Sequence, residues 1–71
     1  FKAGKADAAV EYLDSAAKGM PDNAEIQYHL AAALAASGRK SDALAPARKA
    51  VAGTLSPATR VEATKLLAEL Q

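Results

Sequence analysis

Glu25 and His29 are the two side chains whose spacing comes closest to acid–base chemistry in this sequence. A separation of four residues places a carboxylate and an imidazole on one side of a helix, within reach of each other. His29 is the single histidine of the chain, and a lone pair of this kind is more often a surface ion pair than an acid–base couple. The pair by itself does not predict catalysis.

Other residues that carry chemistry are missing from the 71 residues. The chain has no cysteine, so it has no thiol nucleophile, no thiolate zinc ligand and no disulfide. It has no glycine-rich phosphate loop and no set of carboxylates at metal-ligand spacing. We therefore expect no enzyme activity, no cofactor and no metal. Because there is no cysteine to indicate a redox compartment, localisation stays open between cytosol and periplasm.

The charges are nearly balanced, with nine basic and eight acidic side chains and a net charge of +1. Five basic residues of the second half could form a phosphate-binding patch: Arg39, Lys40, Arg48, Lys49 and Arg60. No aromatic residues alternate with them for base stacking, so we interpret them as a solvated surface and expect no nucleic acid partner. No apolar run approaches the roughly 18 residues of a membrane span, and the first residues do not resemble a secretory signal. We expect no membrane contact by this segment, which begins without methionine and is expected to be excised from a longer protein.

The apolar spacing predicts four helices, and the chain therefore belongs to the all-α class. The first is expected over about 5–18, ended by Gly19 and Pro21, with Val10, Leu13 and Met20 in its apolar stripe. Asp22 and Glu25 have the spacing of a capping box, which predicts the start of a second helix that runs to near Gly38. The third is expected over 41–52, ended by Gly53, and the fourth begins with Ser56 as cap and Pro57 in the first turn. Its apolar face is expected to hold Ala63, Leu66, Leu67 and Leu70.

Pro46 conflicts with the third helix, because proline inside a helix removes a hydrogen bond and costs about 3 kcal/mol. We expect either a late start near Asp42, which would bring Pro46 close to the tolerated first turn, or a kink. Neither outcome is expected to have a functional meaning.

The sequence repeats itself when it is shifted by 34 residues, which is a period of helix-turn-helix repeats. The shift pairs residues of the same kind: Gly4 with Gly38, Lys5 with Arg39, Ala9 with Ala43, Val10 with Leu44 and Ala16 with Ala50. In the later copy, Leu30, Ala31 and Leu34 form the first-helix signature, and Gly38, Ala43 and Ala50 follow as turn glycine and small packing residues. This pattern resembles the tetratricopeptide repeat, and Pro21 matches the closing proline of a preceding copy.

The resemblance implies a fragment of an α-solenoid built from antiparallel helix pairs. It divides the chain into a partial repeat (1–21), one complete repeat (22–55) and a C-terminal capping helix (56–71). Two departures stand out: Gln27 replaces the usual aromatic residue, and the second closing proline, Pro57, comes two residues late. The segment 26–30, followed by alanine-rich sequence, is similar to the last repeats of large bacterial tetratricopeptide lipoproteins of exopolysaccharide and protein-sorting systems.

The resemblance also implies that the first helix of each repeat lines a concave face where peptides dock. The residues expected on that face are Glu25, Tyr28, His29, Ala32, Ala33 and Ala36, extended by Thr64, Lys65 and Ala68. Six of these form the predicted partner-binding site: Glu25, Tyr28, His29, Ala32, Ala36 and Lys65. Tyr28 offers a bound peptide an aromatic anchor and His29 offers a titratable ring, while Lys65 could pair with a carboxylate of the peptide. The competing interpretation is that Tyr28 packs between repeats and His29 is merely exposed. The lysines and asparagines with which some family members grip a terminal carboxylate are absent from these positions, which disfavours a chaperone-tail adaptor.

Two functions remain in competition. The first is a protein-interaction scaffold whose concave face binds a peptide or protein. The second is a purely structural C-terminal cap of a longer solenoid, without a ligand of its own. We also expect self-association through the truncated first helix, where Phe1, Val10 and Leu13 would be left uncovered.

Overall fold

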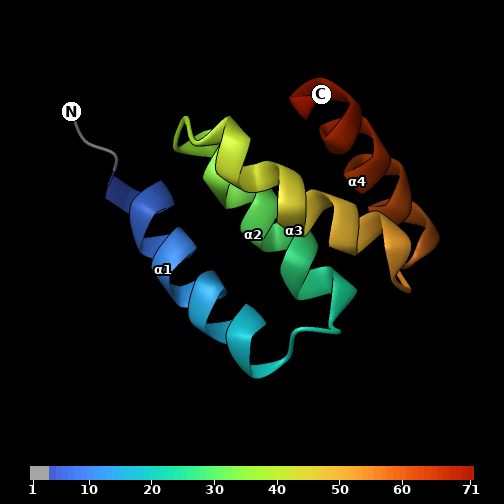
Figure 1. Cartoon of the computed structure of the whole chain (residues 1–71), viewed down its shortest axis with the longest axis horizontal. Helices are drawn as coiled ribbons and strands as arrows, with labels where there is room; N and C mark the ends of the chain where they lie inside the picture. Colours follow the sequence, from blue (N-terminus) through green and yellow to red (C-terminus); the bar gives the residue numbers. More distant parts are fainter. Residues whose placement is uncertain (1–3) are drawn as a thin grey trace.

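The computed structural model describes residues 4–71, except for the side chains of residues 4–6. It contains four helices, α1 (Gly4–Gly19), α2 (Ala24–Ala36), α3 (Lys40–Ala52) and α4 (Pro57–Leu70). The described residues include no β-strand, and successive helices reverse direction (Figure 1). These features confirm the predicted all-α fold of antiparallel helix-turn-helix units. α2 is the central helix, because it packs on both α1 and α3, while α4 packs chiefly on α3.

The start of α2 differs from the predicted capping box. Asn23, not Asp22, is the cap: its side-chain oxygen accepts a hydrogen bond from the Ile26 N–H at 3.1 Å. A turn in which the Asn23 N–H donates to the Met20 carbonyl (3.0 Å) carries the chain one residue further before the helix begins. The third helical position is then Ile26, so Glu25 cannot play the reciprocal part of a capping box. The predicted cap at Ser56 is confirmed, since its oxygen accepts from the Thr59 N–H.

Gly38 turns the chain between α2 and α3, as the sequence predicts. Its φ of +83° lies in the left-handed region that favours glycine. The Arg39 N–H donates to the Leu34 carbonyl (2.8 Å) and the Gly38 N–H to the Ala35 carbonyl (3.1 Å). This is the bonding pattern of a Schellman motif, which satisfies the last carbonyls of α2 and sets the direction of α3.

Pro46 lies well inside α3, so of the two expected outcomes the late start is wrong, and the kink stays a prediction. The helix begins at Lys40, and the Ala43 N–H already donates to the Arg39 carbonyl at 3.1 Å. An ion pair between Arg39 and Asp42 (3.2 Å) spans this first turn and accompanies the early start. Pro46 is the seventh residue of the helix and is buried. Its nitrogen has no hydrogen to donate, so the helix lacks that backbone hydrogen bond.

The core is built largely from alanine. Ala31, Ala43 and Ala50 are completely buried, and Leu30 and Leu34 of α2 supply the larger apolar side chains. Small side chains let the helix backbones approach closely, which is how a chain with one phenylalanine and two tyrosines forms a core. In α4 only Ala63 is fully buried, and Leu66, Leu67 and Leu70 pack half-buried against the core. Met20 is 53% exposed and does not join the predicted stripe of α1, because it follows the end of that helix.

Candidate partner-binding site

Five of the six predicted site residues come from α2 and lie along one side of it. We call this side the Tyr28 face and define it as Glu25, Tyr28, His29, Ala32 and Ala36. A helix turns by about 100° per residue, so Glu25 and Ala32 point opposite to Leu30 and Leu34. Tyr28 and Ala32 are half-buried, whereas His29 and Ala36 are exposed. The face therefore presents a polar and aromatic end followed by small alanines.

His29 lies against both Tyr28 and Glu25 at the N-terminal end of this face. The rings of Tyr28 and His29 are tilted by 56° with centroids 5.4 Å apart. The His29 Nε2 lies 3.8 Å from the Glu25 Oε1, and both side chains are about half exposed, at 55% and 45%. An ion pair so open to solvent stabilises the helix by little. The cluster offers an aromatic surface, a phenol hydroxyl, an imidazole and a carboxylate within one helical turn.

Lys65 of α4 is the sixth predicted site residue and stands apart from the cluster. It lies two residues after Ala63, which points toward the core, so helical rotation directs Lys65 away from the packed side of α4. Lys65 is exposed and takes part in none of the ion pairs or hydrogen bonds found between described side chains. α2 and α4 have few residues close to each other. The structure thus brings five of the six residues together and leaves Lys65 without a described contact to them.

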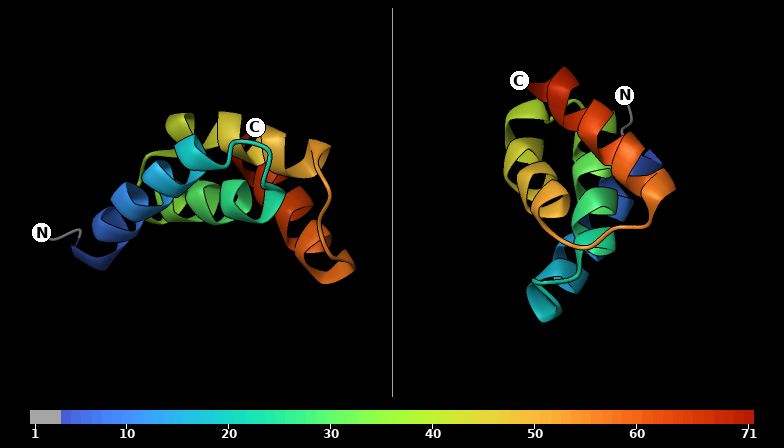
Figure 2. Two further views of the ribbon diagram at one scale, coloured as in Figure 1. Left: turned by 90° about the horizontal axis from the view of Figure 1, so that it is seen from below. Right: turned by 90° about the vertical axis from the view of Figure 1, so that its right-hand side faces the viewer.

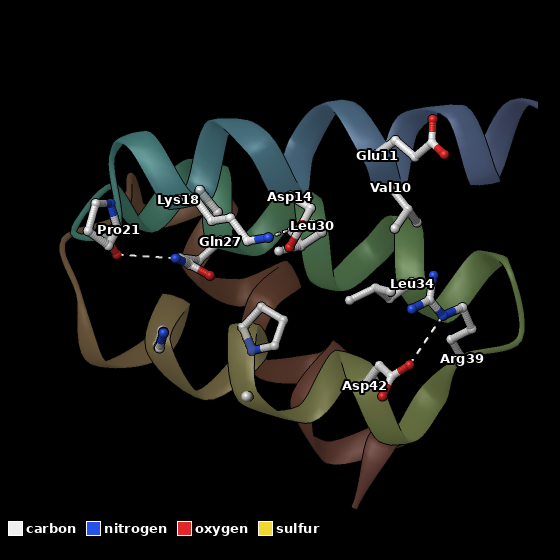
Figure 3. Close-up of a pocket in the computed structure, with 14 residues that line it drawn as sticks. Val10, Glu11, Asp14, Lys18, Pro21, Gln27, Leu30, Leu34, Arg39 and Asp42 are labelled. Carbon is white, nitrogen blue, oxygen red and sulfur yellow. Dashed lines mark hydrogen bonds and ion pairs between the residues drawn. The ribbon is translucent and has the colours of Figure 1, made fainter.

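A groove opens on the other side of α2, where the sequence predicted no site. Its floor is α2, and its walls are α1 and α3 (Figure 3). We call it the α1–α3 groove; its volume is about 570 Å³. The floor is apolar, formed by Leu30 and Leu34, and the rims carry ion pairs between Lys18 and Asp14 (3.1 Å) and between Arg39 and Asp42. None of the six predicted site residues lines it.

Gln27 is the residue of this groove that sequence reasoning passed over. It is only 4% exposed, and its side-chain nitrogen donates to the Pro21 carbonyl at 3.1 Å. Gln27 stands where the repeat usually has an aromatic residue, and no role was predicted for it. A signal was present, because Gln27 lies three and seven residues before Leu30 and Leu34 and so shares their side of the helix.

Two of the five basic residues of the second half have partners within the chain. The Arg60 guanidinium donates to the carbonyls of Val51 (2.9 Å) and Gly53 (2.5 Å), which binds α4 to the end of α3. Arg39 is paired with Asp42. Arg60 therefore joins α4 to α3, whereas the exposed Arg39–Asp42 pair contributes little to stability.

Two further structural findings concern chemistry and membranes. Among the described residues, no three His, Asp or Glu side chains come close enough together to hold a metal ion. None of the described helices combines the length and the apolar character of a membrane span.

Comparison with known proteins decides the family. The family model described as "Tetratricopeptide repeat" matches residues 1–70, which is nearly the whole chain. The chain belongs to the tetratricopeptide repeat family. No curated protein and no solved structure shows significant similarity to it. Tetratricopeptide repeats generally mediate protein–protein interactions and are typically non-catalytic, so protein partners are the general expectation for this chain.

The helix order fits the repeat. In tetratricopeptide terms, α2 and α3 form a helix pair joined by the Gly38 turn, and α1 and α4 flank it in the chain (Figure 2). The small residues Ala31, Ala43 and Ala50, on which the resemblance rested, are the three completely buried alanines of that pair. The signature residues are therefore packing residues, and they define the fold without specifying a partner.

Proposed function

We propose that this chain is a protein-interaction module that holds a peptide segment of a partner on the Tyr28 face, without catalysis. The observation that carries the proposal is the contact cluster of Glu25, Tyr28 and His29 on the side of α2 opposite to its core-facing leucines. A tyrosine that is only half-buried keeps part of its ring available to a partner. Tyrosine is among the residues most enriched at interaction hot spots.

The small residues of the same face support a peptide ligand. Beyond the aromatic end, Ala32 and Ala36 leave room for the side chains of a peptide that lies along α2. The peptide would gain affinity from packing on Tyr28 and from hydrogen bonds to Glu25 and His29. Lys65 completes the proposed site if the ligand extends toward α4 and carries a carboxylate.

The rival function is a purely structural one. In that case 22–55 is the one complete repeat and 56–71 is a helix that caps a longer solenoid and binds nothing. The half-buried leucines of α4, packed on the core, are the observation that favours it. The similarity of 26–30 to the last repeats of large bacterial lipoproteins, which we carry forward as a proposal, would fit either function.

Selection from a random peptide display library on the whole 71-residue chain separates the two. We expect selected peptides to bind the double variant Tyr28→Ala/His29→Ala at least about tenfold more weakly, because loss of one hot-spot residue alone costs about 2 kcal/mol. Tyr12→Ala is the matched control, since Tyr12 is a tyrosine of α1 that is 74% exposed. Circular dichroism of each variant confirms that the helices persist.

Failure to select any peptide, or equal affinity for the wild type and the double variant, would discard binding on the Tyr28 face. The first result favours the structural cap. The second shows that the ligand binds elsewhere on the chain.

A further inference from the structure

The α1–α3 groove has the dimensions of a ligand site. Its walls are set apart: α1 and α3 both pack on α2, and no Cα atom of one lies within 8 Å of a Cα atom of the other in the described part of the chain. A volume of about 570 Å³ falls within the usual range of binding pockets. A second hollow of about 330 Å³ shares Pro21, Gln27 and Lys49 with it, so the groove continues toward Gly53.

Gln27 presents a hydrogen-bond acceptor to this groove. The Pro21 carbonyl can only accept, so the amide nitrogen of Gln27 must face Pro21 and the amide oxygen must face away from it. Figure 3 shows this oxygen on the groove side. It accepts none of the hydrogen bonds found between described residues. No side-chain nitrogen or oxygen of the described residues is both fully buried and without a hydrogen-bond partner, so the Gln27 oxygen keeps some exposure although the residue is only 4% exposed.

A helix would be a poor donor for this oxygen. The backbone N–H groups of a helix are used internally beyond its first turn, whereas every second N–H of an extended segment is free. An extended chain therefore satisfies the Gln27 oxygen with its backbone, whatever its sequence. This favours an extended segment as the occupant.

Three basic and three acidic side chains line the groove, so it has no net charge overall, but Lys49, unpaired among the described side chains, leaves a positive charge at its Gln27 end. Lys18 comes from α1 and Lys49 from α3, and both line the groove. Lys18 is paired with Asp14, while Lys49 takes part in none of the ion pairs found between described side chains. An occupant with a carboxylate at this end is complementary in charge. An apolar side chain is complementary to the floor of Leu30 and Leu34.

The length of the floor sets the spacing of these two groups. Gln27 and Leu34 are seven residues apart on a helix, which is about 10 Å along its axis. In an extended chain, side chains two residues apart point the same way and are separated by roughly 6.6 Å. An apolar residue seated near Leu30 and Leu34 thus places an acidic residue, two positions along, at the lysine end.

We propose that the α1–α3 groove is a second, separate binding site, which takes an extended peptide segment with a large apolar residue and an acidic residue two positions apart. The apolar side chain packs on Leu30 and Leu34, a backbone N–H donates to the Gln27 oxygen, and the carboxylate meets Lys49. This site is independent of the Tyr28 face.

The test is a titration of the isotope-labelled whole chain, followed by NMR. The probe is a capped seven-residue peptide with leucine two positions before glutamate, flanked by glycine and serine. We expect amide shifts at Gln27, Leu30 and Lys49, with binding in the millimolar range for so short a ligand. Replacing the glutamate of the peptide by glutamine should weaken binding about threefold, because the ion pair with Lys49 that is lost is partly exposed and such pairs make small contributions to affinity.

Variants of the chain check each contact. Lys49→Gln should weaken binding of the glutamate peptide about threefold and leave binding of the glutamine peptide unchanged. Gln27→Met, which keeps the size and loses the acceptor, should weaken both peptides about two- to tenfold. Lys40→Gln, an exposed lysine of the same helix outside the groove, is the matched control and should change neither. Lys49 is exposed, so its variant remains folded and informative even if Gln27→Met is unstable.

Three results would overturn the proposal: shifts confined to Tyr28 and His29, equal affinity for the acidic and glutamine peptides, or unchanged binding to Lys49→Gln. The double variant Tyr28→Ala/His29→Ala should bind the probe as the wild type does. Its loss of library-selected peptides, described above, tests the Tyr28 face separately.

Discussion

Gly53, at the end of α3, lies directly against Ala24, at the start of α2. A methyl group built on Gly53 would be 2.8 Å from the Cβ of Ala24, closer than two carbon atoms can approach without displacement. The backbone of Gly53 is extended, with φ −96° and ψ −168°, so any residue could adopt it. Glycine is required there because of the close approach of the two helices.

Gly53→Ala is therefore expected to lower the free energy of unfolding by about 1–3 kcal/mol, the usual cost of overpacking. Urea denaturation followed by circular dichroism measures it. Gly19→Ala is the control, because nothing lies within 4 Å of a methyl group at Gly19, and it should stabilise the chain by up to about 1 kcal/mol. Adding Ala24→Gly to Gly53→Ala should restore part of the loss, and the absence of any such recovery would contradict the steric explanation.

Gly38→Ala tests whether backbone conformation requires glycine in the turn between α2 and α3. Space is available, but the φ of +83° costs a residue with a Cβ about 1–2 kcal/mol. The same denaturation experiment measures the change. Asparagine tolerates this conformation better, so Gly38→Asn should lose less stability than Gly38→Ala. Equal stability of Gly38→Ala and the wild type would show that the turn relaxes without cost.

Arg60 is expected to hold α4 in place through the carbonyls of Val51 and Gly53. We predict that Arg60→Gln speeds hydrogen exchange of the α4 amides about fivefold and leaves α2 unchanged, because exposed hydrogen bonds from a charged group contribute roughly 1 kcal/mol. Arg48→Gln, at a neighbouring exposed arginine with no described hydrogen bond, is the control. Equal exchange in both variants would leave Arg60 without this role.

Self-association remains a prediction, but the surface involved changes. Val10 is 6% exposed and Leu13 is half-buried, so they are not uncovered as expected, and Phe1 lies outside the described residues. Tyr12 and Met20 are the large exposed apolar side chains of this end, at 74% and 53%. We expect concentration-dependent dimers in sedimentation velocity that Tyr12→Ser/Met20→Ser reduces, with Val61→Ser as the control at an exposed valine of α4. Only monomer at high concentration would refute it.

Local signals predicted much of the fold because they act within a few residues. Gly38 and Ser56 were read correctly, since a left-handed turn and a serine cap depend on neighbours three or four residues away. The boundary at Asp22 was missed by one residue, because the turn closed between Met20 and Asn23 competes with the capping box. The late start at Pro46 was wrong because the packing of α3 on α2, a long-range interaction, outweighs the local cost of a proline.

The sequence by itself determined the family, through the 34-residue period and the alanines at its packing positions. It also placed the five residues of the Tyr28 face on one side of a helix, because helical periodicity is a property of one segment. The tertiary structure decided which side of α2 is hollow. That hollow arises from the spacing of α1 and α3, which both pack on α2 but have no Cα atoms within 8 Å of each other in the described part of the chain. It also decided what Gln27 and Gly53 do, because the Pro21 carbonyl and the Ala24 methyl group that explain them are brought close only when the helices pack.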